Sequence, residues 1–414
     1  MVAGRAAHAG SREESALEFY RVAESLAENP RRTRDALWGQ LAAASSLEMD
    51  EAHQLVERLE NSLSRSDQYE LVRMADRKLG IDSRFGVITS LANARRVAEL
   101  VPYLDDPFAR CSFRSVFASV LVLNAAYEEA HKQALLLHDD ATEFRVDVAL
   151  PYAHLVLAYA LAGLGRHTDA HLAIDNGTRE ARRCNDDYGL QNFYACRVRI
   201  LVQQGRGIEA CALELPDLGH SVPSILGEVL SVRGLALATI GRFAEARSMG
   251  ERASVASKAV ETRVLVAAIG ALCDLRERTS HMRASVDSFM YAGMDSGGID
   301  LVVTAYRGNP DLLEALLASE TTREQTTHVV TRAGDADLLV AAGLEPASLY
   351  DPLKSLSRRE HDVYELLCDG LGNAEIGQRL FITEGTVKVH VHHIFDKLGV
   401  RSRTALAINA ARRR

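Results

Sequence analysis

The 414-residue sequence has few of the features that mark secreted or membrane proteins. Its six cysteines are scattered without a C-x-x-C pair, which is typical of buried thiols in a reducing compartment, although a disulfide between some pair stays open. Residues 1–15 lack the apolar core of a signal peptide. The most apolar run, residues 155–164, is too short to span a bilayer. We therefore expect a cytoplasmic protein that does not enter the membrane.

Catalytic motifs are also missing. No G-x-x-x-x-G-K-[ST] occurs, so no loop of this kind cradles a nucleotide phosphate. The acidic pairs Asp105-Asp106 and Asp139-Asp140 are typical of loops and helix caps rather than of a catalytic dyad. We expect no enzyme and no cofactor.

The net charge of −8 is unevenly distributed. Residues 356–414 contain ten Lys and Arg against seven Asp and Glu, a balance of +3, so the remaining chain carries −11. A basic tail on an acidic body is typical of a tethered DNA-binding module.

Proline is scarce, and residues 1 to about 290 are rich in Ala, Leu, Glu and Arg, with apolar positions three and four residues apart. No sustained alternation indicates a strand. Helix starts are marked at Asn29-Pro30, Ser66-Asp67 and Asn309-Pro310. The sequence predicts an all-α fold.

A unit recurs in this helical body: a small or apolar residue, a glycine or alanine seven later, and an alanine five after that. The copies are Ala118, Ala125, Ala130; Ala158, Gly165, Ala170; Val198, Gly205, Ala210; and Gly234, Gly241, Ala246. Fainter copies lie near residues 10–16 and 47–52. The pattern predicts antiparallel helix pairs joined by tight turns and resembles the tetratricopeptide repeat. The alternative is an irregular helical bundle with coincidental spacing.

The predicted domains follow from these patterns. Residues 1–293 form a tetratricopeptide-like helical-repeat solenoid, and residues 294–341 its terminal helices. Residues 342–355, with prolines at 346 and 352, form a linker. Residues 356–414 form a small C-terminal domain, for which a family resemblance implies four helices and DNA binding.

Three helix starts follow closely in this last segment. Ser357 and Glu360 make a capping box, S-x-x-E. Asn373 is expected to cap a second helix ending at Leu380, and Thr383 a third ending near Lys397. Two short helices with a tight connection, the second amphipathic, predict a helix-turn-helix.

The tail resembles the LuxR-type helix-turn-helix domain of NarL/FixJ-like regulators. The pattern is carried by Leu356, Arg359, Glu360, Gly370, Asn373, Glu375, Ile376, Leu380, Thr383, Thr386, Val387, Lys388, His390, Ile394, Lys397, Leu398, Val400, Ser402 and Arg403. It departs from the family at Gly372, where Ser or Thr is usual, and at Gly377, where Ala is usual. A glycine inside a helix costs up to about 1 kcal/mol.

The third helix has two predicted faces. Val387, Val391, Ile394 and Leu398 are expected to pack on Val363, Leu367, Ile376 and Leu380. The opposite face carries Lys388, Val389 and His392, which the resemblance assigns to base contacts in the major groove. Thr383, Thr386 and Lys397 are candidates for phosphate contacts. His390, His392 and His393 lack further ligands at metal-binding spacing, so we expect no metal.

The resemblance also implies double-stranded DNA as partner and a homodimer contact through a C-terminal helix at 404–411. Leu406 and Ile408 there fit docking within one chain equally well. Helical repeats before such a tail resemble the C-terminal half of MalT-like ATP-binding LuxR regulators, without their ATPase module. We predict a transcriptional regulator whose repeats receive a small inducer or a protein. The alternatives are a protein-interaction adaptor and a fragment of an ATP-dependent switch.

Overall fold

The computed structural model describes residues 1–9, 12–62, 67–86, 91–219, 221–344, 356–368, 371–380, 382–398, 403 and 406. The chain divides into two compact units, one of residues 1–88 with 97–338 and one of residues 89–96 with 339–414. Each unit is considered by itself. All regular structure in the described residues is helical, as the sequence predicts.

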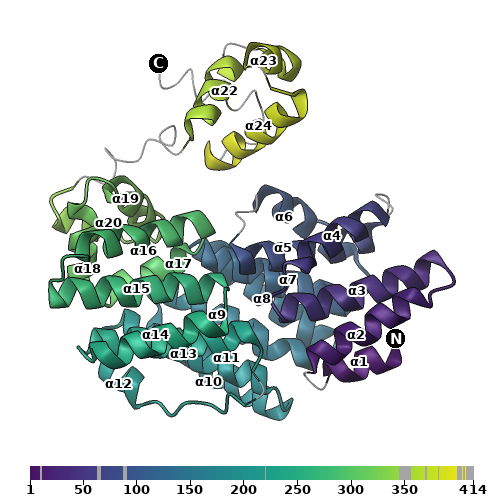
Figure 1. Cartoon of the computed structure of the whole chain (residues 1–414), viewed down its shortest axis with the longest axis horizontal. Coiled ribbons are helices and arrows are strands. Elements are labelled where there is room, and N and C mark those ends of the chain that lie inside the picture. Colours follow the sequence, from purple (N-terminus) through teal and green to yellow (C-terminus); the bar gives the residue numbers. More distant parts are fainter. Residues whose placement is uncertain are drawn as a thin grey trace. The chain divides into compact units, whose positions relative to one another are not determined.

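Up to residue 344 the described chain contains, in chain order, α1 (Val2–Ala9), α2 (Glu13–Ser25), α3 (Pro30–Ser46), α4 (Glu51–Ser62), α5 (Gln68–Phe85), α6 (Leu91–Ala98), α7 (Pro107–Leu123), α8 (Tyr127–Glu143), α9 (Leu150–Gly163), α10 (His167–Arg183), α11 (Asp187–Gln203), α12 (Gly207–Ala212), α13 (Pro223–Thr239), α14 (Phe243–Ala256), α15 (Val260–Glu277), α16 (Met282–Ser296), α17 (Ile299–Arg307), α18 (Pro310–Ala318), α19 (Arg323–Arg332) and α20 (Ala336–Ala341). Figure 1 shows them as stacked helices. No described helix is both long and apolar enough to cross a membrane.

The recurring unit of the sequence marks the turns between paired helices. The central residues Ala125, Gly165, Gly205 and Gly241 all have a left-handed backbone, with φ between +53° and +82°. In each turn the next amide donates to a carbonyl five residues back, as Ala126 does to Leu121 at 2.8 Å. This is a Schellman-type helix end, which glycine favours because it has no Cβ. The predicted helix pairs α7–α8, α9–α10, α11–α12 and α13–α14 are confirmed.

The sequence predicts helix starts at Asp67 and at Asn309, and only Asp67 forms a side-chain cap. Asp67 caps α5 by accepting the amides of Tyr69 and Glu70, as expected. Asn309 precedes Pro310 of α18 but forms no side-chain cap. Its amide group instead donates to the Ala305 carbonyl at 2.8 Å and its oxygen accepts from Arg276. A tertiary partner therefore replaces the local cap.

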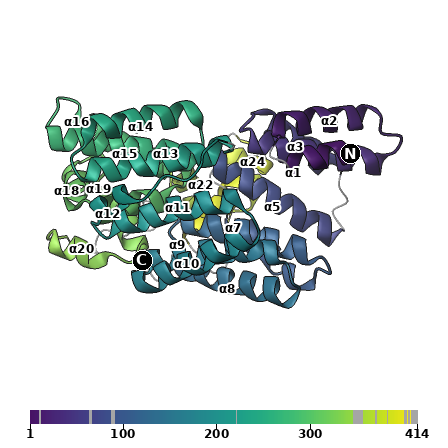
Figure 2. The same cartoon turned by 90° about the horizontal axis from the view of Figure 1, so that it is seen from below.

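The stack of pairs curls round α17. The first helices α5, α7, α9, α11, α13 and α15 pack each on the next, and α17 packs on α7, α11 and α15. Helices pack 8–10 Å apart, so α7 and α15 would lie roughly 40 Å apart in a straight stack. A nine-residue helix is only about 13 Å long, so the stack must bend round it. Figure 2 shows α5, α7, α9, α11, α13 and α15 from below.

A second contact brings the early helices onto the later ones. Glu48, in the turn between α3 and α4, accepts hydrogen bonds from the Ser257 hydroxyl at 2.7 Å and the Lys258 amide at 2.8 Å. Arg263 of α15 donates to the carbonyl of Phe85 at the end of α5. The body is therefore a curled solenoid in which the turn between α3 and α4 and the end of α5 contact the beginning of α15.

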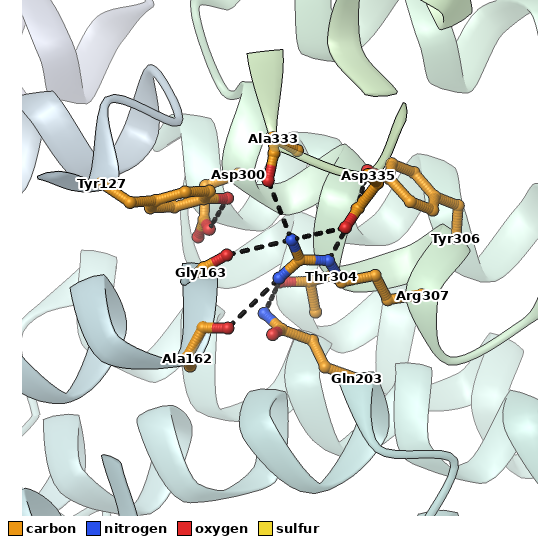
Figure 3. A network of polar contacts seen from close by, with 10 residues as sticks. All are labelled: Tyr127, Ala162, Gly163, Gln203, Asp300, Thr304, Tyr306, Arg307, Ala333 and Asp335. Carbon is orange, nitrogen blue, oxygen red and sulfur yellow. Dashed lines mark hydrogen bonds and ion pairs between the residues drawn. The ribbon is translucent and has the colours of Figure 1, made fainter. Parts of the chain in front are cut away.

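Polar contacts fix α17 inside the body (Figure 3). The Asp300 side chain, 2% exposed, accepts from the Tyr127 hydroxyl of α8 at 2.7 Å and forms an ion pair with Arg199 of α11. One turn later, Gln203 of α11 donates to the Thr304 hydroxyl at 2.9 Å. Eight of the nine residues of α17 are buried. The inner face of the curled stack is thus filled by α17, a helix of the same chain.

Arg307 closes the far end of α17. Its guanidinium donates to the carbonyls of Ala162 and Gly163 at the end of α9, and to Ala333 after α19. It also pairs with Asp335 at 2.8 Å. Carbonyls at helix ends carry partial negative charge, so one arginine stabilises both ends. Arg307 therefore ties α19 to the middle of the solenoid.

Candidate nucleic-acid interface

The C-terminal unit contains α22 (Arg358–Cys368), α23 (Asn373–Leu380) and α24 (Glu384–Leu398). The predicted capping box starts α22: the Glu360 amide donates to the Ser357 hydroxyl at 3.3 Å and the Ser357 amide to the Glu360 carboxylate at 2.7 Å. The predicted Thr383 cap starts α24, accepting the Thr386 amide at 3.1 Å. Both expectations are confirmed.

The start of α23 differs from the prediction. Asn373 is the first residue of the helix, and Gly372 precedes it. Glu375 reaches back to accept the Gly372 amide at 2.6 Å, which satisfies an amide at the helix start. The Asn373 oxygen instead accepts from Arg403 at 2.7 Å. Gly372 lies outside the helix, so the free-energy cost of a glycine inside a helix does not apply to it.

One shared core holds the three helices together. Its buried members are Leu356, Val363, Tyr364, Leu367, Ile376, Val387, Ile394 and Leu406, with Leu380, Val391 and Leu398 packed against them. The predicted packing of α24 on the first two helices is therefore confirmed. Leu406 is 1% exposed, so it docks within its own chain and is not available to a second copy. The rest of the predicted helix at 404–411 lies outside the described residues.

Gly377 sets the close approach of α23 to the turn before α24. A Cβ at this position would lie 2.8 Å from the Ile382 carbonyl oxygen, closer than van der Waals contact permits. The Ile382 amide donates to the Gly377 carbonyl at 3.0 Å, which closes the turn. Arg359 of α22 also donates to the Leu380 carbonyl at 2.6 Å and so caps the end of α23. The sequence offered Arg359 only as a family match, because its acceptor is 21 residues away.

A buried carboxylate links α22 to α24. Glu360, 5% exposed, accepts from the Lys397 ammonium at 2.7 Å, and His393 Nδ1 lies 3.7 Å from its other oxygen. Burial would raise the pKa of Glu360, but hydrogen bonds from Lys397 and Ser357 bring this pKa below its ordinary value. Lys397, predicted as a phosphate contact, therefore also has a structural partner inside the domain.

The predicted base-contact residues lie together on the face of α24 opposite the core. The Lys388 side chain is 64% exposed and Val389 is 52% exposed, while His392 is half-buried. Lys388 pairs with Glu384, one turn earlier, at 3.0 Å. Because both groups are exposed, this pair is worth about 1 kcal/mol or less and can be exchanged for a DNA contact.

Thr383 and Thr386 lie at the exposed N-terminal end of α24. Their hydroxyl oxygens are 2.8 Å apart, so one hydroxyl hydrogen is used between them. The second hydrogen is left to donate outward. Among the described residues, no group of three or more His, Cys, Asp and Glu side chains is arranged to hold a metal ion.

Comparison with known proteins agrees with this geometry. Residues 354–410 match the profile of the bacterial regulatory proteins of the luxR family. The chain is 33% identical over 104 residues to the oxygen regulatory protein NreC of Staphylococcus aureus, in strains JH9 and NCTC 8325 / PS 47 alike. This match covers 24% of the chain and 48% of NreC, so the chain spans about half the length of the curated relatives it matches.

Three short helices on one core, with an exposed polar face on the third, define a helix-turn-helix domain. With the profile match, residues 354–410 are a LuxR-type helix-turn-helix domain at the end of an all-helical body. The resemblance of that body to MalT-like regulators stays a prediction.

Proposed function

We propose that this protein is a sequence-specific DNA-binding regulator of transcription whose helix α24 enters the major groove. The observation that carries the proposal is the division of α24 into a buried face, with Val387 and Ile394, and an exposed face, with Lys388, Val389 and His392. The relatives named above are regulatory proteins, which supports the same role.

Each residue on the exposed face has a base edge that suits its chemistry. The Lys388 ammonium donates to the acceptors of guanine, and Val389 contacts the methyl group of thymine. The His392 imidazole either donates to or accepts from a base. Lys388 exchanges its Glu384 partner for the DNA on binding.

Phosphate contacts fix the position of α24 without reading sequence. The hydroxyl hydrogen left by the Thr383–Thr386 pair donates to a phosphate at the start of the helix. Lys397 is the third candidate, and its ion pair with Glu360 holds the ammonium in place on the domain surface. Of the three phosphate-contact candidates, Lys397 is the one with an ion-pair partner inside the domain, so it is the weakest candidate for a DNA contact.

We assign the helical body to signal reception. The adaptor alternative needs an open inner groove for a partner, and along α17 that groove is filled by buried chain. A peptide-binding adaptor could therefore not use this part of the groove, and a signal must reach the body elsewhere. The alternative of an ATP-dependent switch would be supported by a phosphate-binding loop encoded in frame upstream of residue 1.

The test is selection of duplex DNA from a random pool by the full-length chain, followed by affinity measurements on the enriched site. Lys388→Ala is expected to weaken binding roughly 5- to 150-fold, because a good base contact is worth about 1–3 kcal/mol. Affinity should also fall linearly with salt on logarithmic scales.

Lys132→Ala is the matched control, since Lys132 is an exposed lysine of α8 in the body. It removes the same charge and is expected to leave affinity unchanged. Enrichment of no common motif would contradict the proposal. So would equal affinities for the wild type and Lys388→Ala without salt dependence.

A further inference from the structure

The third helix pair departs from the others. Its second helix, α12, has six residues, whereas α8 and α10 have 17 each. After Ala212 the backbone becomes extended at Leu213, and the described residues 213–219, 221 and 222 before α13 are not helical. Pro216 has no amide hydrogen and clashes with a preceding helical turn, so the helix cannot continue through it.

The missing helical turns leave a cavity of about 740 Å³ beside α11. One wall comes from α10 and α11, a second from residues 213, 214, 216, 217, 221 and 222, and a third from Glu13, Ser46 and Arg84 of the early helices. A second hollow of about 450 Å³ shares Arg197 and Leu213 with the first. The larger volume lies in the range of small-molecule sites.

The irregular wall is held in place before any ligand arrives. The Gln191 amide donates to the Asp217 carbonyl at 2.7 Å. Arg233 of α13 donates to the carbonyls of Ala210 at 3.2 Å and Leu213 at 3.1 Å, which caps the shortened α12. A preformed wall lowers the ordering cost of binding.

Two arginines on the cavity have no acidic partner. Arg84 is half-buried and donates to the Ser45 carbonyl at 2.9 Å, and neither it nor Arg182 forms an ion pair within the described part of the chain. Arg197, in contrast, is paired with Asp175 at 2.6 Å. A half-buried guanidinium without a counter-ion suits a carboxylate, which it can bind through two parallel hydrogen bonds.

The rest of the lining is aromatic and acidic, and besides the buried Glu13 it contains carboxylates that are exposed. Tyr188, Phe193 and Tyr194 supply the aromatic surface. Glu214 and Asp187 are exposed there and have no ion pair in the residues that the structure describes. The site therefore offers a cation for a carboxylate, an apolar middle and free carboxylates for an ammonium group.

We propose that this cavity binds a small zwitterion with a free carboxylate, a free ammonium group and an apolar body, either an amino acid or a short peptide. Arg84 binds the carboxylate, and Glu214 receives the ammonium group. Its use as the signal of a regulator rests on the proposed function, whereas the binding site itself does not.

Isothermal titration calorimetry on the full chain tests the site with L-phenylalanine, L-leucine and the dipeptide L-phenylalanyl-L-leucine. At least one probe is expected to bind with a Kd below about 1 mM, equivalent to about 4 kcal/mol. Acetylating its amine or amidating its carboxylate should weaken binding tenfold or more. Tighter binding of the dipeptide would identify the source as a peptide, and the reverse order as an amino acid.

Arg84→Ala is expected to weaken binding tenfold or more, and Arg182→Ala, at an exposed position, to weaken it several-fold without disturbing the fold. Arg242→Ala is the control, since Arg242 is exposed and paired with Glu245 outside the cavity. Absence of binding by every probe, or equal binding by wild type and both cavity variants, would overturn the proposal. The measurement contains no DNA, so its failure is distinct from a failure of DNA binding.

Discussion

Lys397 in the last turn of α24 donates to the Glu360 carboxylate of α22 over 2.7 Å, and the same carboxylate closes the capping box of α22. One buried side chain therefore fixes both the start of the first helix and the position of the helix assigned to DNA. The sequence predicted the capping box, but not the contact between Glu360 and Lys397.

Glu360→Gln is expected to lower the stability of the C-terminal domain by about 2 kcal/mol at pH 7, because it weakens a hydrogen bond between charged groups. The pKa of Glu360 lies below the ordinary 4.5, so its contribution is present above that pH and is lost as pH falls through the folded-state pKa. The difference in stability between the wild type and Glu360→Gln should therefore become smaller as the pH falls. Hydrogen exchange of peptides from residues 356–398 measures this stability difference between the wild type and the variant. Glu365→Gln, an exposed change on the same helix, should have little effect.

Gly377→Ala is expected to destabilise the turn between α23 and α24, although alanine favours a helix by about 1 kcal/mol. The reason is the 2.8 Å approach of the new Cβ to a backbone oxygen, which cannot move without shifting α24. Lower exchange protection and weaker DNA binding should follow. Gly372→Ala is the control, because its Cβ would meet only the movable end of Glu375 at 3.3 Å. A more stable Gly377→Ala domain would refute this reading of the turn.

His392→Lys is expected to strengthen DNA binding at low salt and to steepen the salt dependence by about one unit of logarithmic slope, since each cation near phosphate releases a counterion. The motif recovered by selection should change at one base position. Titration of binding against salt concentration measures the slope. His281→Lys, on an exposed residue of the body, should leave the slope unchanged if α24 alone meets the DNA.

Asp300→Asn is expected to cost about 3–5 kcal/mol, because it leaves Arg199 buried without its main counter-ion. Urea unfolding followed by circular dichroism measures the loss. The double change Arg199→Met with Asp300→Leu should lose less than the sum of the single changes, since it removes both charges. Additive losses would show that the two side chains do not act as a pair.

Glu228 predicts a pH dependence of the opposite sign. Burial, with repulsion from Glu261, raises the pKa of Glu228 to about 7, although Arg199 opposes the shift. The folded state then holds a proton that the unfolded chain releases near pH 4.5, so stability falls as pH rises from about 4.5 to 7. Glu228→Gln should flatten the Tm profile over this window. An unchanged profile would contradict the assignment.

Local signals in the sequence were sufficient for much of the fold. Ala125, Gly165, Gly205 and Gly241 were identified by spacing, and each is the left-handed residue of a turn. Such helix ends depend on about six consecutive residues, so short-range patterns predict them. The predicted caps that do not form are those whose side chain binds a residue far away in the sequence. Asn309 accepts a hydrogen bond from Arg276, and Asn373 accepts one from Arg403. The truncated α12 carried a signal in Pro216 that the repeat pattern concealed.

The sequence by itself determined the all-helical class, the paired repeats and the LuxR-type domain, because helix periodicity, caps and turn glycines act over a few residues. Only the tertiary structure decided that α17 fills the inner face of the solenoid. The contacts that hold it there join residues 101 and 173 positions apart, from Arg199 and from Tyr127 to Asp300. No local pattern encodes such a pairing, since it depends on the curvature accumulated over every intervening helix. The cavity beside α11 likewise needs the tertiary structure, because the fold brings Glu13 and Arg84 of early helices to the same lining as Tyr188.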